Sequence, residues 1–147
     1  MAYHNPVMLE ESLQGLKIKP AGIYADMTFG GGGHSMAILQ ELGDEGRLLA
    51  FDQDEDARAN LPDDPRFTFI HSNFRFLKHF LRFYGIEKLD GLLADLGISS
   101  HQIDLADRGF TYREDADLDM RMNRENPITA ERVLNEYSEE ELMRIFR

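Results

Sequence analysis

Four consecutive glycines, Gly30–Gly33, stand between a short apolar run and a stretch with helical spacing. Glycines let a backbone turn sharply and let a ligand approach it closely, and a helix that starts there offers unpaired N–H groups. A phosphate-clamping NTPase loop needs a lysine after its last glycine, and His34 stands there instead. The dinucleotide pattern G-x-G-x-x-G fits Gly30 and Gly32 but meets Ser35 at its third glycine. The loop therefore predicts a nucleotide-type ligand without choosing one, and a plain flexible loop is the alternative.

A carboxylate follows at the spacing that such a ligand requires. Asp52 closes the second predicted strand, near the offset of about 20 residues at which an acid meets a ribose hydroxyl. One carboxylate can accept hydrogen bonds from both hydroxyls of a ribose. This spacing supports an adenosine-type ligand but does not separate a nicotinamide cofactor from S-adenosylmethionine. A surface or capping acid is the alternative for Asp52.

Two further segments follow the ends of predicted strands. Phe74 comes after the third strand, where an aromatic ring can lie against an adenine or belong to the core. The run Asp95–Gln102 follows the fourth strand and gathers a carboxylate, two hydroxyls and an amide. We expect reaction chemistry there, with a polar strand-exit loop as the alternative.

A predicted helix over Phe74–Tyr84 carries both cations and phenylalanines. Three cations share one face of it, with His79 beside them: Arg75, Lys78 and Arg82. This stripe fits contacts to phosphates, and a solvated outer face is the alternative. Three phenylalanines recur at helical spacing and are expected in the core: Phe76, Phe80 and Phe83.

Alternating strands and helices must position these residues. Apolar runs predict strands at Ile23–Met27, Arg47–Phe51, Phe67–Ile70 and Leu89–Ala94. Helical spacing predicts helices over residues 7–16, Ser35–Leu42, Asp54–Asn60 and Phe74–Tyr84. The alternation predicts an α/β fold whose parallel sheet has the spatial order 3-2-1-4 and helices on both faces. The second and fourth strands are apolar enough to be covered on both sides.

The chain after Gly97 has a different character. Residues 98–126 are polar and show neither period, and helical spacing returns over Thr129–Leu134 and Ser138–Arg147, where Ser138 and Glu141 match a capping box. A doubly wound sheet normally has five or more strands, so we expect the N-terminal half of such a sheet within a longer protein. The open edge of the fourth strand would then invite self-association, for example as a homodimer.

Composition sets outer limits on function. A chain of 147 residues suits about one domain. Acidic residues outnumber Lys and Arg by 27 to 16, which argues against gripping nucleic acid through overall charge and leaves room for a local basic face. The absence of cysteine excludes disulfides and thiolate metal sites, and no metal site is predicted. Without a long apolar run or a signal peptide, we expect a cytoplasmic protein with no membrane partner.

Five motifs occur in order along nearly the whole chain: His4–Glu11, Asp26–Ser35, Asp95–Gln102, Arg108–Tyr112 and Leu118–Met122. Together they resemble the motifs of the ribosomal RNA small subunit methyltransferase H family, which are S-adenosylmethionine-dependent cytosine-N4 methyltransferases of bacteria. Two departures accompany the resemblance. His101 stands where the family usually has proline, and family members are about twice as long, like chains of two domains.

The resemblance implies a Rossmann-like class I methyltransferase fold, S-adenosylmethionine as the cofactor and small-subunit ribosomal RNA as the partner. It implies that residues 1–104 bind the cofactor, and that residues 105–147 form a loop and the start of an inserted helical substrate-recognition domain. The implied cofactor-binding residues are Gly32, Gly33 and His34 at the methionine end, Asp52 at the ribose, Phe74 at the adenine, and Asp95 and Gln102.

Methyl transfer from a sulfonium is an in-line displacement, in which positioning does much of the catalysis. A cytosine amine is a poor nucleophile, and a carboxylate that accepts one of its N–H bonds would raise its electron density. We therefore expect catalytic roles for Asp95, as that acceptor, and for Ser99, as an orienting group. Two alternatives stay open: an NAD-dependent oxidoreductase of Rossmann topology, and a cofactor-binding fragment without activity.

Overall fold

The computed structural model describes residues 6–147, so the start of the motif His4–Glu11 lies outside the described residues. The chain forms two compact units, residues 1–96 and 97–147. The break follows Leu96, whereas the predicted change of role follows Asp104. The segment between these two positions, which includes Gln102, therefore belongs to the second compact unit.

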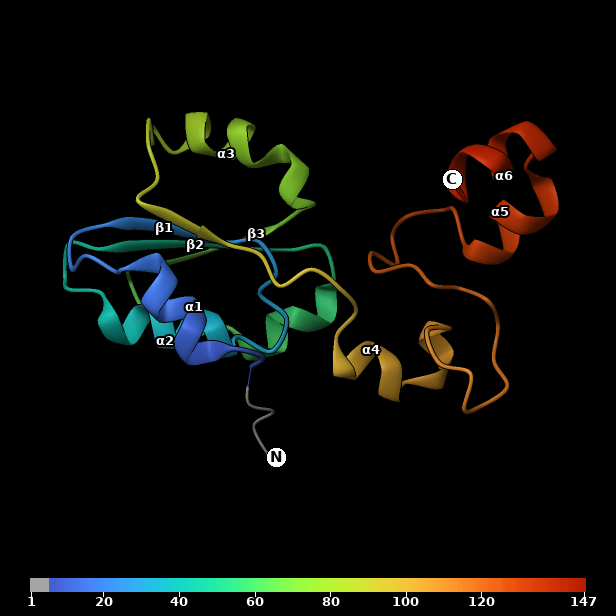
Figure 1. The fold of residues 1–147 in the computed structure, drawn as a ribbon, viewed down its shortest axis with the longest axis horizontal. Helices are drawn as coiled ribbons and strands as arrows, with labels where there is room; N and C mark the ends of the chain where they lie inside the picture. The colour runs from blue at the N-terminus through green and yellow to red at the C-terminus, as the bar shows by residue number, and fades with distance from the viewer. Residues whose placement is uncertain (1–5) are drawn as a thin grey trace. The chain divides into compact units, whose positions relative to one another are not determined.

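The first unit holds a four-stranded parallel sheet in the order β3-β2-β1-β4, as predicted (Figure 1). Its strands are β1 (Ile23–Asp26), β2 (Arg47–Asp52), β3 (Phe67–His71) and β4 (Gly91–Leu93). β1 pairs with β2 on one side and with β4 on the other. The strand order therefore reverses its direction at β1, which is the arrangement of a Rossmann-like fold.

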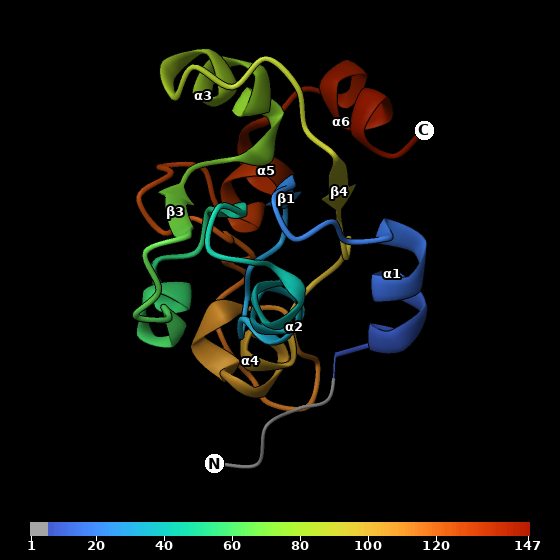
Figure 2. The same ribbon diagram turned by 90° about the vertical axis from the view of Figure 1, so that its left-hand side faces the viewer.

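Helices cover both faces of this sheet. α1 (Leu9–Leu16) and α2 (Gly33–Glu41) lie on one face, and α3 (Leu77–Phe83) lies on the other (Figures 1 and 2). Two short 3-10 helices complete the unit: η1 (Glu55–Asn60) and η2 (Phe74–Phe76), which leads directly into α3. All four helices predicted for this unit are therefore present, two of them wholly or partly in the tighter 3-10 form.

β2 is the centre of the core. Its side chains alternate between the two faces, so that Leu49 and Phe51 pack with the α3 side and Leu48 packs with α2. Leu48, Leu49 and Phe51 are at most 3% exposed. The expectation that this strand is covered on both faces is confirmed.

The same expectation is wrong for β4. Leu93 is buried, but Leu92 is 46% exposed. α1 contacts β4 from one side, where a side chain at Gly91 would meet Leu16 and Tyr24. Leu92 pairs in register with Ala25 and so points to the α3 face, where it remains open to solvent. Among the described residues β4 is an edge strand, and the apolar sequence of an edge strand does not guarantee a cover on both sides.

The phenylalanines of α3 and η2 also differ from expectation. Phe80 packs against the core beside Leu77 and Leu81, whereas Phe76 is 44% exposed and Phe83 is 74% exposed. Positions 77, 80 and 81 define the helix face that meets the sheet, and at 100° per residue Phe83 turns away from it. The core assignment is therefore confirmed for Phe80 and wrong for the other two.

The second unit contains α4 (Ser100–Asp104), the 3-10 helix η3 (Ala106–Arg108), α5 (Ala130–Glu136) and α6 (Glu139–Ile145). The last two were predicted, including the capping box of Ser138 and Glu141. The polar segment between η3 and α5 is organised by arginines. Arg108 is buried and donates to the carbonyl oxygens of Arg121 and Met122, both at 3.1 Å. No helix among residues 6–147 is long and apolar enough to cross a membrane.

We predict that Phe51→Ala lowers the free energy of unfolding by about 3–5 kcal/mol, because it empties a fully buried ring site. Phe83→Ala, which removes an exposed ring, should change it by less than about 0.5 kcal/mol. Urea unfolding followed by circular dichroism measures both. A loss in Phe83→Ala as large as that in Phe51→Ala would contradict the exposed position of Phe83 on α3.

Candidate functional site

The carboxyl ends of the parallel strands bring the predicted ligand-binding residues of the first unit to one edge of the sheet. Asp26 ends β1, Asp52 ends β2, and Phe74 follows β3 after a two-residue turn. Asp95 follows β4 at the same edge. Ligands of open α/β sheets bind at this edge, where the strand order reverses, and here that point lies between β1 and β4.

Asp26 holds the base of the glycine loop. Its side chain is fully buried and accepts the hydroxyl of Ser35 at 2.7 Å and the backbone N–H of Thr28 at 3.0 Å. Burial raises the pKa of Asp26, and these two hydrogen bonds oppose that rise. One carboxyl group thus joins the end of β1 to the start of α2 on either side of the loop.

Asp52 fixes the loop from the neighbouring strand. Its Oδ2 accepts the N–H of Gly30 at 2.7 Å, and its Oδ1 accepts the N–H of Asp54 at 2.9 Å. Burial raises the pKa of Asp52, while the hydrogen bonds from Asp54 and Gly30 lower it. Backbone N–H groups thus hold the carboxylate that is predicted to meet a ribose against the loop. Each of its oxygens can accept a further hydrogen bond.

The glycine loop leaves its outer surface open. A Cβ at Gly31 would meet nothing within 4 Å, and one at Gly30 would meet only the carbonyl oxygen of Thr28 at 3.9 Å. Gly32 caps α2 with a φ of 81°, in the left-handed region that favours glycine. Asn60 donates to the carbonyl oxygen of Gly30 at 3.1 Å. A ligand can thus approach the backbone of Gly30 and Gly31 without displacing side chains.

The chain before α1 packs against the end of this loop. A Cβ at Gly33 would lie 2.3 Å from Cγ of Pro6. The ring of His34 is buried, and its Nε2 lies 3.0 Å from the carbonyl oxygen of Val7. Because this ring already contacts protein, the part of His34 that is free for a ligand is its backbone at the start of α2.

A second set of contacts ties the ends of β2 and β3. Nδ2 of Asn73 donates to Oε1 of Gln53 at 3.1 Å, and the ring of His71 lies 3.2 Å from the carbonyl oxygen of Gln53. Asn73 also caps η2, in which Phe74 is the first residue and is 39% exposed. Phe74 is therefore a partly open aromatic ring at the sheet edge, as an adenine-contacting residue requires.

Asp95 is exposed, and its backbone N–H donates to Oγ1 of Thr28 at 2.8 Å. This bond crosses from β4 to β1 and places Asp95 beside the base of the glycine loop. Thr28 and Asp26 were not predicted as site residues, although both stand in the motif Asp26–Ser35. Their role lies in shaping the loop, and a short polar side chain beside a glycine run was the available signal.

Ser99 and Gln102 form a capping box. The hydroxyl of Ser99 accepts the N–H of Gln102, and Oε1 of Gln102 accepts the N–H of Ser99, both at 3.1 Å. The spacing S-x-x-Q is typical of this motif and marks the start of α4, a helix that was not among those predicted. The two side chains thus have a structural task in the second unit, and their predicted catalytic and cofactor roles stay predictions. Among residues 6–147 no cluster of His, Asp or Glu could hold a metal ion.

The first unit is thus a Rossmann-like α/β unit, with a glycine loop after β1 and an acid at the end of β2. The sequence model of the MraW methylase family matches residues 1–147, and the chain belongs to that family.

Three bacterial relatives carry the name ribosomal RNA small subunit methyltransferase H. The protein of Flavobacterium johnsoniae is 62% identical over 146 residues, that of Christiangramia forsetii 60% and that of Bacteroides thetaiotaomicron 56%. Each alignment covers 99% of this chain and 48% of the relative. The chain therefore spans about half the length of the curated relatives it matches.

We predict that Ser35→Ala lowers the free energy of unfolding by about 1–3 kcal/mol at neutral pH, because it removes a donor from a buried carboxyl group. The raised pKa of Asp26 means that the folded chain binds this proton more tightly than the unfolded chain. Its burial therefore destabilises the fold increasingly as pH rises from the ordinary value through the raised pKa.

The Ser35 hydroxyl offsets this penalty when Asp26 is ionised, so the loss in Ser35→Ala should shrink as pH falls below the raised pKa. Denaturant titrations at several pH values measure it. Ser12→Ala, which alters a hydroxyl in α1 instead, is the control. A loss that is independent of pH would remove Asp26 from the explanation.

Proposed function

We propose that this chain is the cofactor-binding portion of an S-adenosylmethionine-dependent methyltransferase that acts on the N4 amine of a cytosine in small-subunit ribosomal RNA. The observation that carries the proposal is the contact between Asp52 and Gly30, which sets an acid at the open side of the glycine loop. Membership of the MraW methylase family and the names of the relatives support the same reaction class.

The described residues fit this cofactor. The loop backbone at Gly30 and Gly31 is open to an approaching ligand. Asp52 has the free acceptor capacity to take two ribose hydroxyls, and the half-open ring of Phe74 suits an adenine face. Gly32, Gly33 and the backbone of His34 would bind the methionine end, where α2 offers N–H groups. Asp95 is proposed to complete the pocket within the first unit, and the cofactor role of Gln102 stays a prediction.

When bound, the cofactor supplies an electrophilic methyl group on a sulfonium. Held by the glycine loop and Asp52, that methyl group would be the electrophile for the N4 amine, and the electron pair of the broken carbon–sulfur bond would leave with the sulfur. Asp95 is proposed to accept a hydrogen bond from the amine N–H and then to take its proton. The exposed carboxylate of Asp95, held by its backbone at Thr28, suits that task. The orienting role of Ser99 stays a prediction. The target base has to leave its stack to reach such a site.

We predict that Asp52→Ala weakens S-adenosylmethionine binding by about 1.5–3 kcal/mol, the contribution of hydrogen bonds to a charged group. Isothermal calorimetry measures the affinity, and circular dichroism checks the fold. Asp52→Asn keeps the shape of the side chain, and Asp63→Asn changes an exposed acid of the same unit as a control. Unchanged affinity in a folded Asp52→Ala chain would remove Asp52 from the site. Tighter binding of NAD than of S-adenosylmethionine would favour an oxidoreductase instead.

We also predict that the chain binds cofactor better than it methylates, because its cofactor-binding residues are present while it spans about half the length of its relatives. Methylation of small ribosomal subunits by this chain and by the Flavobacterium johnsoniae relative would be compared at equal cofactor saturation. Equal turnover would show that the remaining half of the relative is dispensable.

A further inference from the structure

We propose that the outward side of α3 and η2 is a contact surface for single-stranded RNA. This α3 outer face consists of three cations, two phenylalanines and a histidine: Arg75, Phe76, Lys78, His79, Arg82 and Phe83. All six are exposed. The inference deepens the proposed function, because it rests on an RNA substrate and names a surface outside the cofactor site.

The charge of this segment opposes that of the whole chain. The chain carries 27 acidic residues, yet none lies between Phe67 and Ile86. Arg75, Lys78 and Arg82 form no ion pair with any other residue in the part of the chain that the structure describes. Cations without an ion-pair partner on an acidic protein suit a polyanionic partner, since no carboxylate pairs with them.

The exposed rings narrow the choice of partner. Phe83 is 74% exposed and Phe76 is 44% exposed, and the guanidinium of Arg75 lies 4.6 Å from the centre of the Phe76 ring. Bases of unpaired RNA stack on aromatic rings and on arginine planes, whereas the phosphates of the same strand take the cations. A duplex hides its bases and an acidic peptide has none, so rings interleaved with cations favour a single strand.

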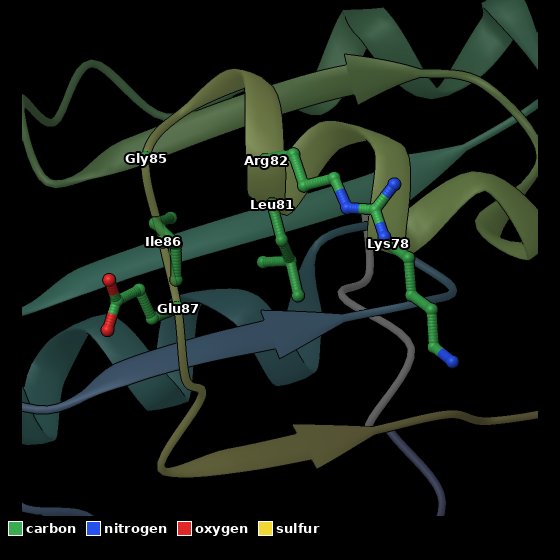
Figure 3. A pocket seen from close by; sticks show the side chains of 6 residues that line it. All are labelled: Lys78, Leu81, Arg82, Gly85, Ile86 and Glu87. Carbon is green, nitrogen blue, oxygen red and sulfur yellow. The ribbon is translucent and has the colours of Figure 1, made fainter.

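The spacing of the cations suits a strand that runs along the helix. Arg75 and Arg82 are separated by a rise of about 10 Å, so they can contact different phosphates. Lys78 and Arg82 also line a pocket of about 500 Å³ beside α3, together with Leu81, Gly85, Ile86 and Glu87. Figure 3 shows both cationic side chains on one side of it and Glu87 on the other. The carboxylate repels phosphate from the pocket, so we place the strand on the α3 outer face instead.

The test is fluorescence anisotropy of the full chain with a labelled oligocytidine of about 20 nucleotides, which exceeds the usual site size of one small domain. Measurements are made without cofactor over a series of salt concentrations. The combined variant Arg75→Ala, Lys78→Ala, Arg82→Ala should bind about tenfold more weakly. The slope of log affinity against log salt should fall in magnitude by about 2, because each of the three lost phosphate contacts accounts for about 0.7. Phe83→Ala should weaken binding by about fivefold or more.

The matched control removes three exposed cations that already have carboxylate partners: Lys19, Arg132 and Arg144, each changed to Ala. It makes the same change in net charge and should keep the affinity within about twofold, because paired cations attract phosphate less. Circular dichroism checks each fold. If the triple variant unfolds, Arg82→Ala is compared with Arg144→Ala, which removes one exposed, paired arginine. Cofactor affinity should stay unchanged in the α3 variants, so this test and the Asp52 test can fail separately.

Two results would overturn the inference. Equal losses in the α3 variant and the control variant would mean that any cation serves. Displacement of the RNA by polyglutamate at equal charge, with no effect of Phe83→Ala, would mean that the face binds anions without reading bases and points to an acidic protein instead.

Discussion

The buried carboxyl group of Asp26 makes the contacts on which the shape of the glycine loop, and so the proposed cofactor site, depends. It accepts hydrogen bonds from both ends of the loop that leaves β1, from Thr28 before the glycines and from Ser35 after them. A charge taken out of water is costly unless such donors surround it. The loop is thereby closed on its inner side and open on its outer side, where Asp52 meets Gly30. Side chains on two neighbouring strands thus define one backbone surface.

Much of the fold was predictable from the sequence, because the elements around β1 and β2 obey simple rules. Apolar runs that alternate with amphipathic stretches give a parallel sheet, and the order 3-2-1-4 follows from the usual crossovers. The errors fall where the spacing of apolar residues does not indicate what packs against them. Leu92 lies in an apolar run that is typical of a covered strand, but its strand is at the edge of the sheet. Phe83 has the helical spacing of a core residue, but its side chain faces solvent.

The site was predictable in its strand ends and less so in its supports. Glycines 30–33 and Asp52 announce themselves by type and spacing, and the structure brings them together. The supporting bonds of Asn73 with Gln53, and of Thr28 with the backbone of Asp95, join residues far apart in the chain. No local pattern announces such pairs. The capping box at Ser99 could have been predicted from its spacing. It shows that polar residues after a strand can have the structural role of starting a helix.

The close approach of Pro6 to Gly33 has an evolutionary consequence. A side chain at position 33 would collide with the proline ring unless the chain before α1 moved away. That same chain holds the His34 ring through the carbonyl oxygen of Val7. Positions 6 and 33 are therefore not free to vary independently. In a lineage that loses the proline, position 33 can accept a residue with a side chain. Covariation between these two positions would be the historical trace of a steric contact.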